Sequence, residues 1–227
     1  MVFEKVTHVI FDLDGLLIES ESIYEQISKE IANEYGKDYT RQLKIKVMGT
    51  TEPETARLIV TELQLPLSPQ EFLVKYERKV KEKLQHPRLM PGAKELVEHL
   101  HRCGIPIAVA TSSREDLMEM KMQFHQDLYK MFNHFVCGSS DPEVKNGKPS
   151  PDIYLVCASR FPDKPDPSKC LAFEDAANGV KSAVGAGMQV VMVPDPDTPE
   201  EKRKSATLVL ESLTEFKPEQ FGLPAMT

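Results

Sequence analysis

The sequence predicts an α/β fold, with a Rossmann-like parallel-sheet core into which an all-helical domain is inserted. From residue 86 onward, short apolar runs alternate with amphipathic segments, as in parallel strands joined by helices. One more strand-like run, residues 6–11, comes first, and the stretch between these two parts has helical periodicity alone. We therefore expect a core of residues 1–17 and 86–227 and a helical insert of residues 18–85, here called the cap.

Composition limits the functions that the chain can have. With 227 residues and a net charge of −7, the chain can bury a sizeable core, but it lacks the basic surface needed for broad nucleic-acid or anionic-membrane binding. We see no apolar run of membrane-spanning length and no secretory signal at the N-terminus. The four cysteines are far apart and lack zinc-site spacing. We expect a reduced, cytoplasmic protein without disulfides and without an obligate protein partner.

The cap is expected to consist of four helices. Glycines at Gly36 and Gly49 end the first two, and Pro53 and Pro69 occupy the first turns of the last two. The expected helices lie within residues 20–35, 43–48, 51–63 and 68–84.

The core is expected to alternate helices and strands. The expected strands are residues 105–111, 135–137, 169–173, 189–193 and 207–210. The expected helices are residues 93–102, 116–129, 152–160 and 178–186, with a polar loop at residues 138–149. Right-handed crossovers would make all neighbouring strands parallel.

Two carboxylates end the first strand. Asp12 and Asp14 flank Leu13 and precede Gly15, so on a continuing strand both side chains would lie on one face. Two like charges this close are unfavourable unless a cation lies between them or one is protonated. Mg²⁺ suits such a place because it binds carboxylates together with water and phosphate oxygens. Residues 12–15 also fit a plain turn, in which Asp and Gly have their usual roles.

Polar pairs follow two other strands in the same way. The three pairs are Asp12 and Asp14, Thr111 and Ser112, and Glu174 and Asp175. Parallel strands bring their carboxyl ends to one edge of the sheet, where α/β proteins bind ligands. We therefore expect three segments that are distant in sequence to meet at one site.

Together these residue types suit phosphoryl transfer, which needs a nucleophile, a metal ion and charge neutralisation. Asp12 is the candidate nucleophile, since a carboxylate can form an aspartyl-phosphate. Asp14 is the candidate general acid and base. Asp175, with Glu174 beside it, would complete the metal site. The alternative for this acidic pair is a loop start with solvated charges.

Three further residues are candidates for binding the phosphoryl group. Thr111 and Ser112 could donate hydrogen bonds to its oxygens, and Lys148, in the loop of residues 146–149, could offset the charge. The alternatives are that Thr111 and the serines after it cap the next helix and that Lys148 is a solvated loop lysine.

These residues resemble the four motifs of the haloacid dehalogenase superfamily. The matching positions are the DxDG run at residues 12–15, Thr111 at a strand end, Lys148 in a GKP loop, and Glu174-Asp175 followed by Asn178-Gly179. The helical insert after the first motif is similar to the family's small cap. The resemblance implies a Mg²⁺-dependent phosphatase that acts on a small phosphorylated metabolite through an aspartyl-phosphate. It also adds Asp14 to the metal site, through its backbone carbonyl.

Two comparisons within this family refine the expectation. Its sugar-phosphate mutases carry a basic residue shortly after a glycine like Gly49, whereas this chain has Thr50, Thr51 and Glu52. A cap without that cation should hold a second phosphate poorly, which favours transfer to water. Family dehalogenases lack the second aspartate of the first motif, and Asp14 fits phosphate-ester cleavage. The expected function is hydrolysis of a small phosphomonoester. A sugar or polyol phosphate such as glycerol 3-phosphate, a mutase, and a non-catalytic binding protein are the alternatives.

Overall fold

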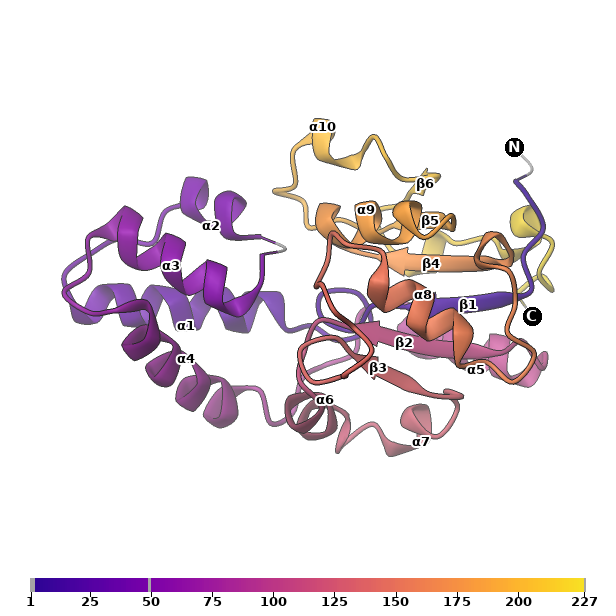
Figure 1. Cartoon of the computed structure of the whole chain (residues 1–227), viewed down its shortest axis with the longest axis horizontal. Coiled ribbons are helices and arrows are strands. Elements are labelled where there is room, and N and C mark those ends of the chain that lie inside the picture. The colour runs from indigo at the N-terminus through magenta and orange to yellow at the C-terminus, as the bar shows by residue number, and fades with distance from the viewer. Residues whose placement is uncertain (1–2, 49, 227) are drawn as a thin grey trace.

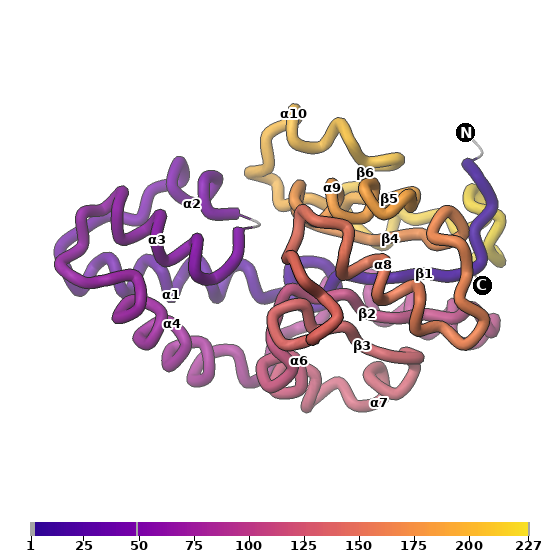
Figure 2. The backbone as a smooth tube through the Cα atoms, in the orientation of Figure 1, coloured from indigo at the N-terminus to yellow at the C-terminus, as the bar shows by residue number. Residues whose placement is uncertain are grey.

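The computed structural model describes residues 3–48 and 50–226. It has two lobes, a sheet-containing core and a helical lobe (Figure 1). The first and last described residues both belong to the end of the core that is distant from the helical lobe (Figure 2).

The core contains a sheet of six parallel strands in the order β3-β2-β1-β4-β5-β6. The strands are β1 (His8–Phe11), β2 (Ile107–Thr111), β3 (Phe135–Cys137), β4 (Cys170–Glu174), β5 (Gln189–Met192) and β6 (Leu208–Val209). β1 lies in the middle, between β2 and β4. The predicted α/β class and parallel pairing are confirmed. Strands β1 and β4 run toward the helical lobe, so their carboxyl ends face it (Figure 1).

Helices cover both faces of the sheet. These elements are α5 (Ala93–Arg102), α6 (Glu115–Met122), α7 (Gln126–Tyr129), α8 (Asp152–Ser159), α9 (Ala177–Gly185) and α10 (Glu200–Arg203), with 3₁₀ turns at Pro167–Lys169, Leu213–Glu215 and Pro218–Phe221. Alternate side chains of β1 point to opposite faces. Val9 and Phe11 pack in the cluster that contains residues of α5 and α6, whereas Ile10 packs in the cluster with α8 and α9.

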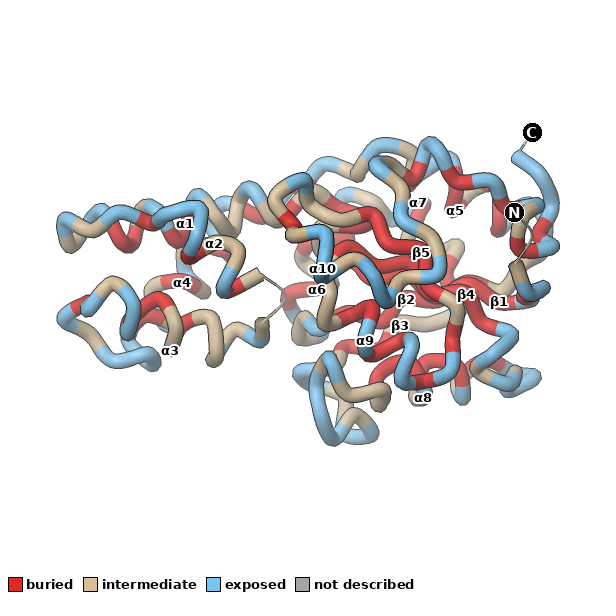
Figure 3. The backbone as a smooth tube through the Cα atoms, turned by 90° about the horizontal axis from the view of Figure 1, so that it is seen from above, coloured by how far each residue is buried: buried red, intermediate tan, exposed pale blue. Residues whose placement is uncertain are grey.

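The cap helices are α1 (Glu21–Glu34), α2 (Arg41–Val47), α3 (Glu52–Leu63) and α4 (Pro69–Lys83). They share their own apolar cluster, which includes Ile27, Ile59 and Phe72, and buried residues gather there and in the sheet (Figure 3). Helix α4 begins with a capping box between Ser68 and Glu71. The expected helix end at Gly49 lies outside the described residues. The limits of the cap at residues 18 and 85 remain a prediction.

The single helix expected over residues 116–129 is wrong, because the chain forms two helices there. α6 ends at Met122 and α7 begins at Gln126. Between them the His125 ring nitrogen Nε2 lies 2.7 Å from the carbonyl oxygen of Pro87, in the segment that returns from the cap. This long-range contact holds the chain in a turn at a place where local periodicity favours a continuous helix.

Candidate active site

Side chains from three neighbouring strands meet at the carboxyl edge of the sheet. Thr111 and Glu174 are the last residues of β2 and β4, and Asp12 directly follows β1. The Asp12 amide donates to the carbonyl oxygen of Phe173 at 2.9 Å, which continues the pairing of β1 with β4 by one residue. The parallel register therefore places these polar groups side by side, as the sequence predicted.

Lys148 joins two of these strand ends. Its Nζ donates to Asp12 Oδ1 at 2.7 Å, to Glu174 Oε1 at 2.6 Å and to the carbonyl oxygen of Ala110 at 3.0 Å. Its side chain is 8 % exposed. A buried ammonium with three acceptors is a fixed positive charge. The alternative of a solvated loop lysine is wrong.

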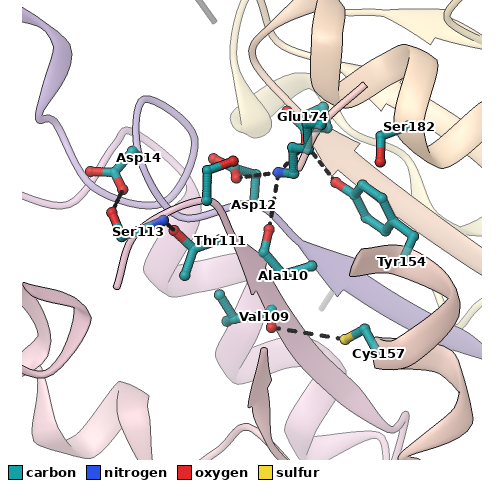
Figure 4. Close-up of polar contacts among 12 residues, drawn as sticks. Asp12, Asp14, Val109, Ala110, Thr111, Ser113, Tyr154, Cys157, Glu174 and Ser182 are labelled. Atoms are coloured by element: carbon teal, nitrogen blue, oxygen red, sulfur yellow. Dashed lines mark hydrogen bonds and ion pairs between the residues drawn. The ribbon is translucent and has the colours of Figure 1, made fainter. Parts of the chain in front are cut away.

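Tyr154 is a partner of this network that the sequence analysis missed. The hydroxyl of Tyr154, on α8, donates to Glu174 Oε1 at 2.6 Å, and the two side chains point toward each other (Figure 4). Lys148 Nζ lies 5.3 Å from the centre of the Tyr154 ring. Tyr154 thus fixes the position of the Glu174 carboxylate, which in turn binds Lys148. Its buried position on an apolar helix carries no sequence signal for this role.

Three carboxylates form a compact acidic group. Each of Asp12, Glu174 and Asp175 offers an oxygen within 4.8 Å of the other two. A Cβ at Gly15, whose φ is +78°, would overlap the Asp175 carboxylate, and a Cβ at Gly179 would overlap that of Glu174. The two glycines therefore allow the acidic side chains to lie close together. Carboxylate oxygens are the donor set that Mg²⁺ prefers, so this group fits such an ion.

Asp14 lies next to this group and has different partners. Lys121 Nζ contacts both of its oxygens, at 2.7 and 2.8 Å. The Ser113 hydroxyl donates to Asp14 Oδ2 at 2.9 Å (Figure 4), and the hydroxyl of Tyr24, on cap helix α1, donates to Oδ1 at 3.1 Å. The sequence analysis missed Lys121, because a lysine in an amphipathic helix normally reaches solvent. Thr111 Oγ1 accepts from the amide of Ser113 at 3.1 Å, which leaves the hydroxyl proton of Thr111 for another acceptor. The alternative that Thr111 and the serines cap the next helix is wrong, because α6 begins after Arg114 and has no side-chain cap.

Burial and neighbouring charges shift the pKa values of the site carboxylates in different directions. Burial raises the pKa of Asp12 to about 8, against the opposing charge of Lys148. Burial and the charge of Asp12 also raise the pKa of Asp175 well above its ordinary range. Burial acts on Asp14 too, but the charge and hydrogen bonds of Lys121 outweigh it and lower the Asp14 pKa. The acidic group is thus destabilised when ionised without a cation, whereas Asp14 is held as a carboxylate.

A cavity of about 190 Å³ covers these groups on the cap side. The core contributes Asp12, Thr111, Ser112, Lys148 and Asp175 to its lining, so the sequence-predicted residues open into one space. The cap contributes the rings of Tyr24, Tyr76 and Phe72, with Tyr76 stacked on both of the others. It also contributes the polar residues Glu21, Lys44, Thr50, Thr51, Glu52 and Thr55.

Residues 9–193 match the family model of the haloacid dehalogenase-like hydrolases. The chain belongs to this family. A curated relative, probable pseudouridine-5'-phosphatase of Drosophila melanogaster, is 50% identical over 226 residues, covering 100% of this chain and 98% of the relative. (DL)-glycerol-3-phosphatase 1, mitochondrial, of Arabidopsis thaliana is 44% identical and covers 97% of this chain and 75% of its own length. The crystal structure of CbbY from Rhodobacter sphaeroides in complex with phosphate aligns with a TM-score of 0.74, at 26% identity, over 92% of this chain and 96% of that one.

This haloacid dehalogenase-like hydrolase therefore has relatives that match almost all of its length and are phosphatases by name, which supports an enzyme of that class. In residues 3–48 and 50–226, no helix combines the length and the hydropathy that a bilayer crossing needs.

Proposed function

We propose that this protein is a Mg²⁺-dependent phosphatase that hydrolyses a small phosphomonoester, pseudouridine 5'-phosphate, through an aspartyl-phosphate. The observation that carries the proposal is the meeting of Asp12, Lys148 and the acidic group at the floor of one cavity. The substrate rests on the full-length relative that is half identical and on the resemblance of residues 11–21, 141–161 and 170–180 to animal pseudouridine-5'-phosphatases.

Asp12 is the proposed nucleophile. Its Oδ1 is bound by Lys148, which keeps the carboxylate oriented toward the cavity and offsets its charge. Attack of the other oxygen on phosphorus would form the aspartyl-phosphate and break the ester bond. Asp14, which is a carboxylate in the free protein, would take up a proton from the bound monoanionic phosphomonoester and give it to the leaving oxygen. In the second step it would take a proton from the water that attacks phosphorus.

The phosphoryl group would be bound by the residues at the carboxyl end of β2 and by Lys148. Thr111 and Ser112 line the cavity beside Asp12, and their hydroxyl and amide groups suit equatorial phosphoryl oxygens. Lys148, which also lines the cavity, would supply the positive charge. We propose Asp12, Asp14 through its backbone carbonyl, Asp175 and Glu174 as residues that hold Mg²⁺. Because Glu174 Oε1 already accepts from Lys148 and Tyr154, its other oxygen would be the one that binds the ion. The ion supplies neutralisation of phosphoryl charge when bound.

The cavity favours a substrate with one phosphate. Its cationic lining side chains, among the described residues, are Lys44 and Lys148, and both are already paired with carboxylates. Thr50, Thr51 and Glu52, which stand where the family's mutases carry a basic residue, line the cavity and add no positive charge. The stacked rings of Tyr24 and Tyr76 suit a planar base on the leaving group. The glycerol-3-phosphatase relative at 44% identity favours glycerol 3-phosphate as the second candidate substrate.

We propose a cytoplasmic protein whose partner is the phosphorylated metabolite, without nucleic acid. The free cysteines Cys103, Cys137, Cys157 and Cys170 and the net charge of −7 support this.

Phosphate release from a panel of metabolites tests the function. The panel contains pseudouridine 5'-phosphate, uridine monophosphate, glycerol 3-phosphate and a sugar bisphosphate, each with and without Mg²⁺. We expect turnover that requires Mg²⁺, is fastest with pseudouridine 5'-phosphate and is lost in Asp12→Asn. Equal phosphate release by the wild type and Asp12→Asn would refute the proposal that this protein is a phosphatase.

A further inference from the structure

Lys121 is a buried cation directed at a single carboxylate. It lies on α6 with 0 % of its surface exposed. Its Nζ contacts the two oxygens of Asp14 at 2.7 and 2.8 Å and the Ser113 hydroxyl at 2.8 Å. Lysine is almost never fully buried unless it is paired, because removing an ammonium from water is costly.

The packing around Lys121 does not require a charge. Its helix neighbours Leu117 and Met118 are buried in apolar clusters, and a residue such as methionine would fill the same space at less cost in desolvation. The charge serves the contact with Asp14 and the Ser113 hydroxyl. The Tyr24 ring lies 5.5 Å from Lys121 Nζ, and the Tyr24 hydroxyl donates to the same carboxylate.

We propose that Lys121 is a positioning residue for Asp14 in the phosphoryl-transfer reaction. Lys121 and Ser113 hold the Asp14 side chain from the core, and Tyr24 contacts it from the cap. The inference rests on the proposed function, since it concerns the acid and base of that reaction. Asp14 follows a strand end and lies in a loop, so its orientation depends on these side-chain contacts.

The two steps make different demands on Asp14. In the first, a bond forms between Asp12 and phosphorus, the ester bond breaks, and the leaving oxygen takes the proton that Asp14 has received from the bound monoanionic phosphomonoester. An alkoxide needs that proton, whereas p-nitrophenolate leaves as a stable anion without it. In the second step, water attacks phosphorus, Asp12 is released, and the water proton restores Asp14. A misplaced Asp14 therefore slows the first step for alkyl phosphates and the second step for every substrate.

Kinetics with two leaving groups test the proposal. For Lys121→Met we expect kcat/KM with pseudouridine 5'-phosphate to fall by about 100-fold, the effect of moving a catalytic group by an ångström. With p-nitrophenyl phosphate we expect kcat/KM to change by less than about 3-fold, because kcat/KM does not include the second step. A stoichiometric burst of p-nitrophenol should then appear, since the aspartyl-phosphate forms faster than it is hydrolysed. Lys121→Arg should restore part of the activity with pseudouridine 5'-phosphate.

Controls separate positioning from folding. Arg114→Met removes a cation at the start of the same helix that binds Glu77 and Asp116 and should leave both kcat/KM values unchanged. If Lys121→Met does not fold, Ser113→Ala removes another donor to Asp14 without leaving a buried charge. We then expect the same selective loss of kcat/KM with pseudouridine 5'-phosphate, but a smaller one. Equal losses for the two substrates, with no burst, would overturn the role of Lys121 alone. A wild-type protein that hydrolyses neither substrate would instead overturn the proposed function, and this inference with it.

Discussion

The carboxylates of Asp12 and Asp175 lie within 4.8 Å of each other, although one follows the first strand of the sheet and the other the fourth. Both are buried. After burial, the charge of Asp12 raises the pKa of Asp175, and the pKa of Asp12 is raised by burial and, against the charge of Lys148, by the charge of Glu174. Such an arrangement is stable at neutral pH when a cation lies between the two groups.

Mg²⁺ should therefore stabilise the protein against heat, and Asp175→Asn should remove most of this effect. An ion present at about 100 times its dissociation constant adds about 2.7 kcal/mol to the free energy of unfolding. Thermal unfolding with and without Mg²⁺ measures the shift. Asp163→Asn, a change to an exposed carboxylate on a core loop, is the control and should keep the full shift. An undiminished shift in Asp175→Asn would show that the ion binds elsewhere.

Without metal, the free energy of unfolding should fall as pH rises. The pKa of Asp12 rises from 3.8 to about 8 and that of Glu21 from 4.5 to about 7 on folding, mainly through burial. Between the unfolded and folded values the native state binds more protons than the unfolded state, so increasing pH favours unfolding. The loss begins above about pH 4 and ends near pH 8. Denaturant unfolding in a chelating buffer at several pH values measures it.

Mg²⁺ should flatten this pH profile, because an ion that binds the ionised carboxylates competes with protons. Asp12→Asn should also reduce the slope in chelating buffer. A metal-free profile that rises between pH 5 and pH 8 would contradict the proposed crowding of ionised groups.

Gly179→Ala should lower activity because the added Cβ overlaps the carboxylate of Glu174. That carboxylate binds Lys148, so its displacement moves the cation away from the phosphoryl group, and we expect kcat/KM to fall by at least about 10-fold. Gly185→Ala, in the same helix, is the matched control, since its Cβ meets Pro151 at an ordinary 3.6 Å. Similar kcat/KM values for the two variants would contradict the claim that activity requires close packing at Glu174.

Lys44→Met should weaken the contact between the cap and the core. Lys44, on α2, binds Asp195 and Asp197 of the core, each at 3.1 Å. These groups are partly exposed, so the expected effect is small, an increase in KM of about 3-fold. Lys46→Met is the control, because Lys46 pairs with Glu62 within the cap. Added salt should raise KM in the wild type and have less effect in Lys44→Met, and steady-state kinetics at several salt concentrations measure both.

The sequence predicted those site residues that follow a strand or stand in a marked loop. Asp12, Thr111 and Glu174 could be placed because β-strand periodicity is clear in short apolar runs and parallel pairing aligns the strand ends. Lys148 could be suggested by its Gly-Lys-Pro context. Lys121 and Tyr154 could not, because each lies inside a helix whose pattern shows which side chains are buried and not what they contact. Their partners are set by how α6 and α8 pack on the sheet, which depends on the whole fold.

The identity of the nucleophile is the central claim, and chemical trapping tests it most directly. The wild type is quenched with acid during turnover of pseudouridine 5'-phosphate, and borohydride then reduces an acyl phosphate to an alcohol. Mass spectrometry of the digested protein should show homoserine in place of Asp12, and none when substrate is omitted. Homoserine at another aspartate, or none in a protein that is turning over substrate, would contradict the account.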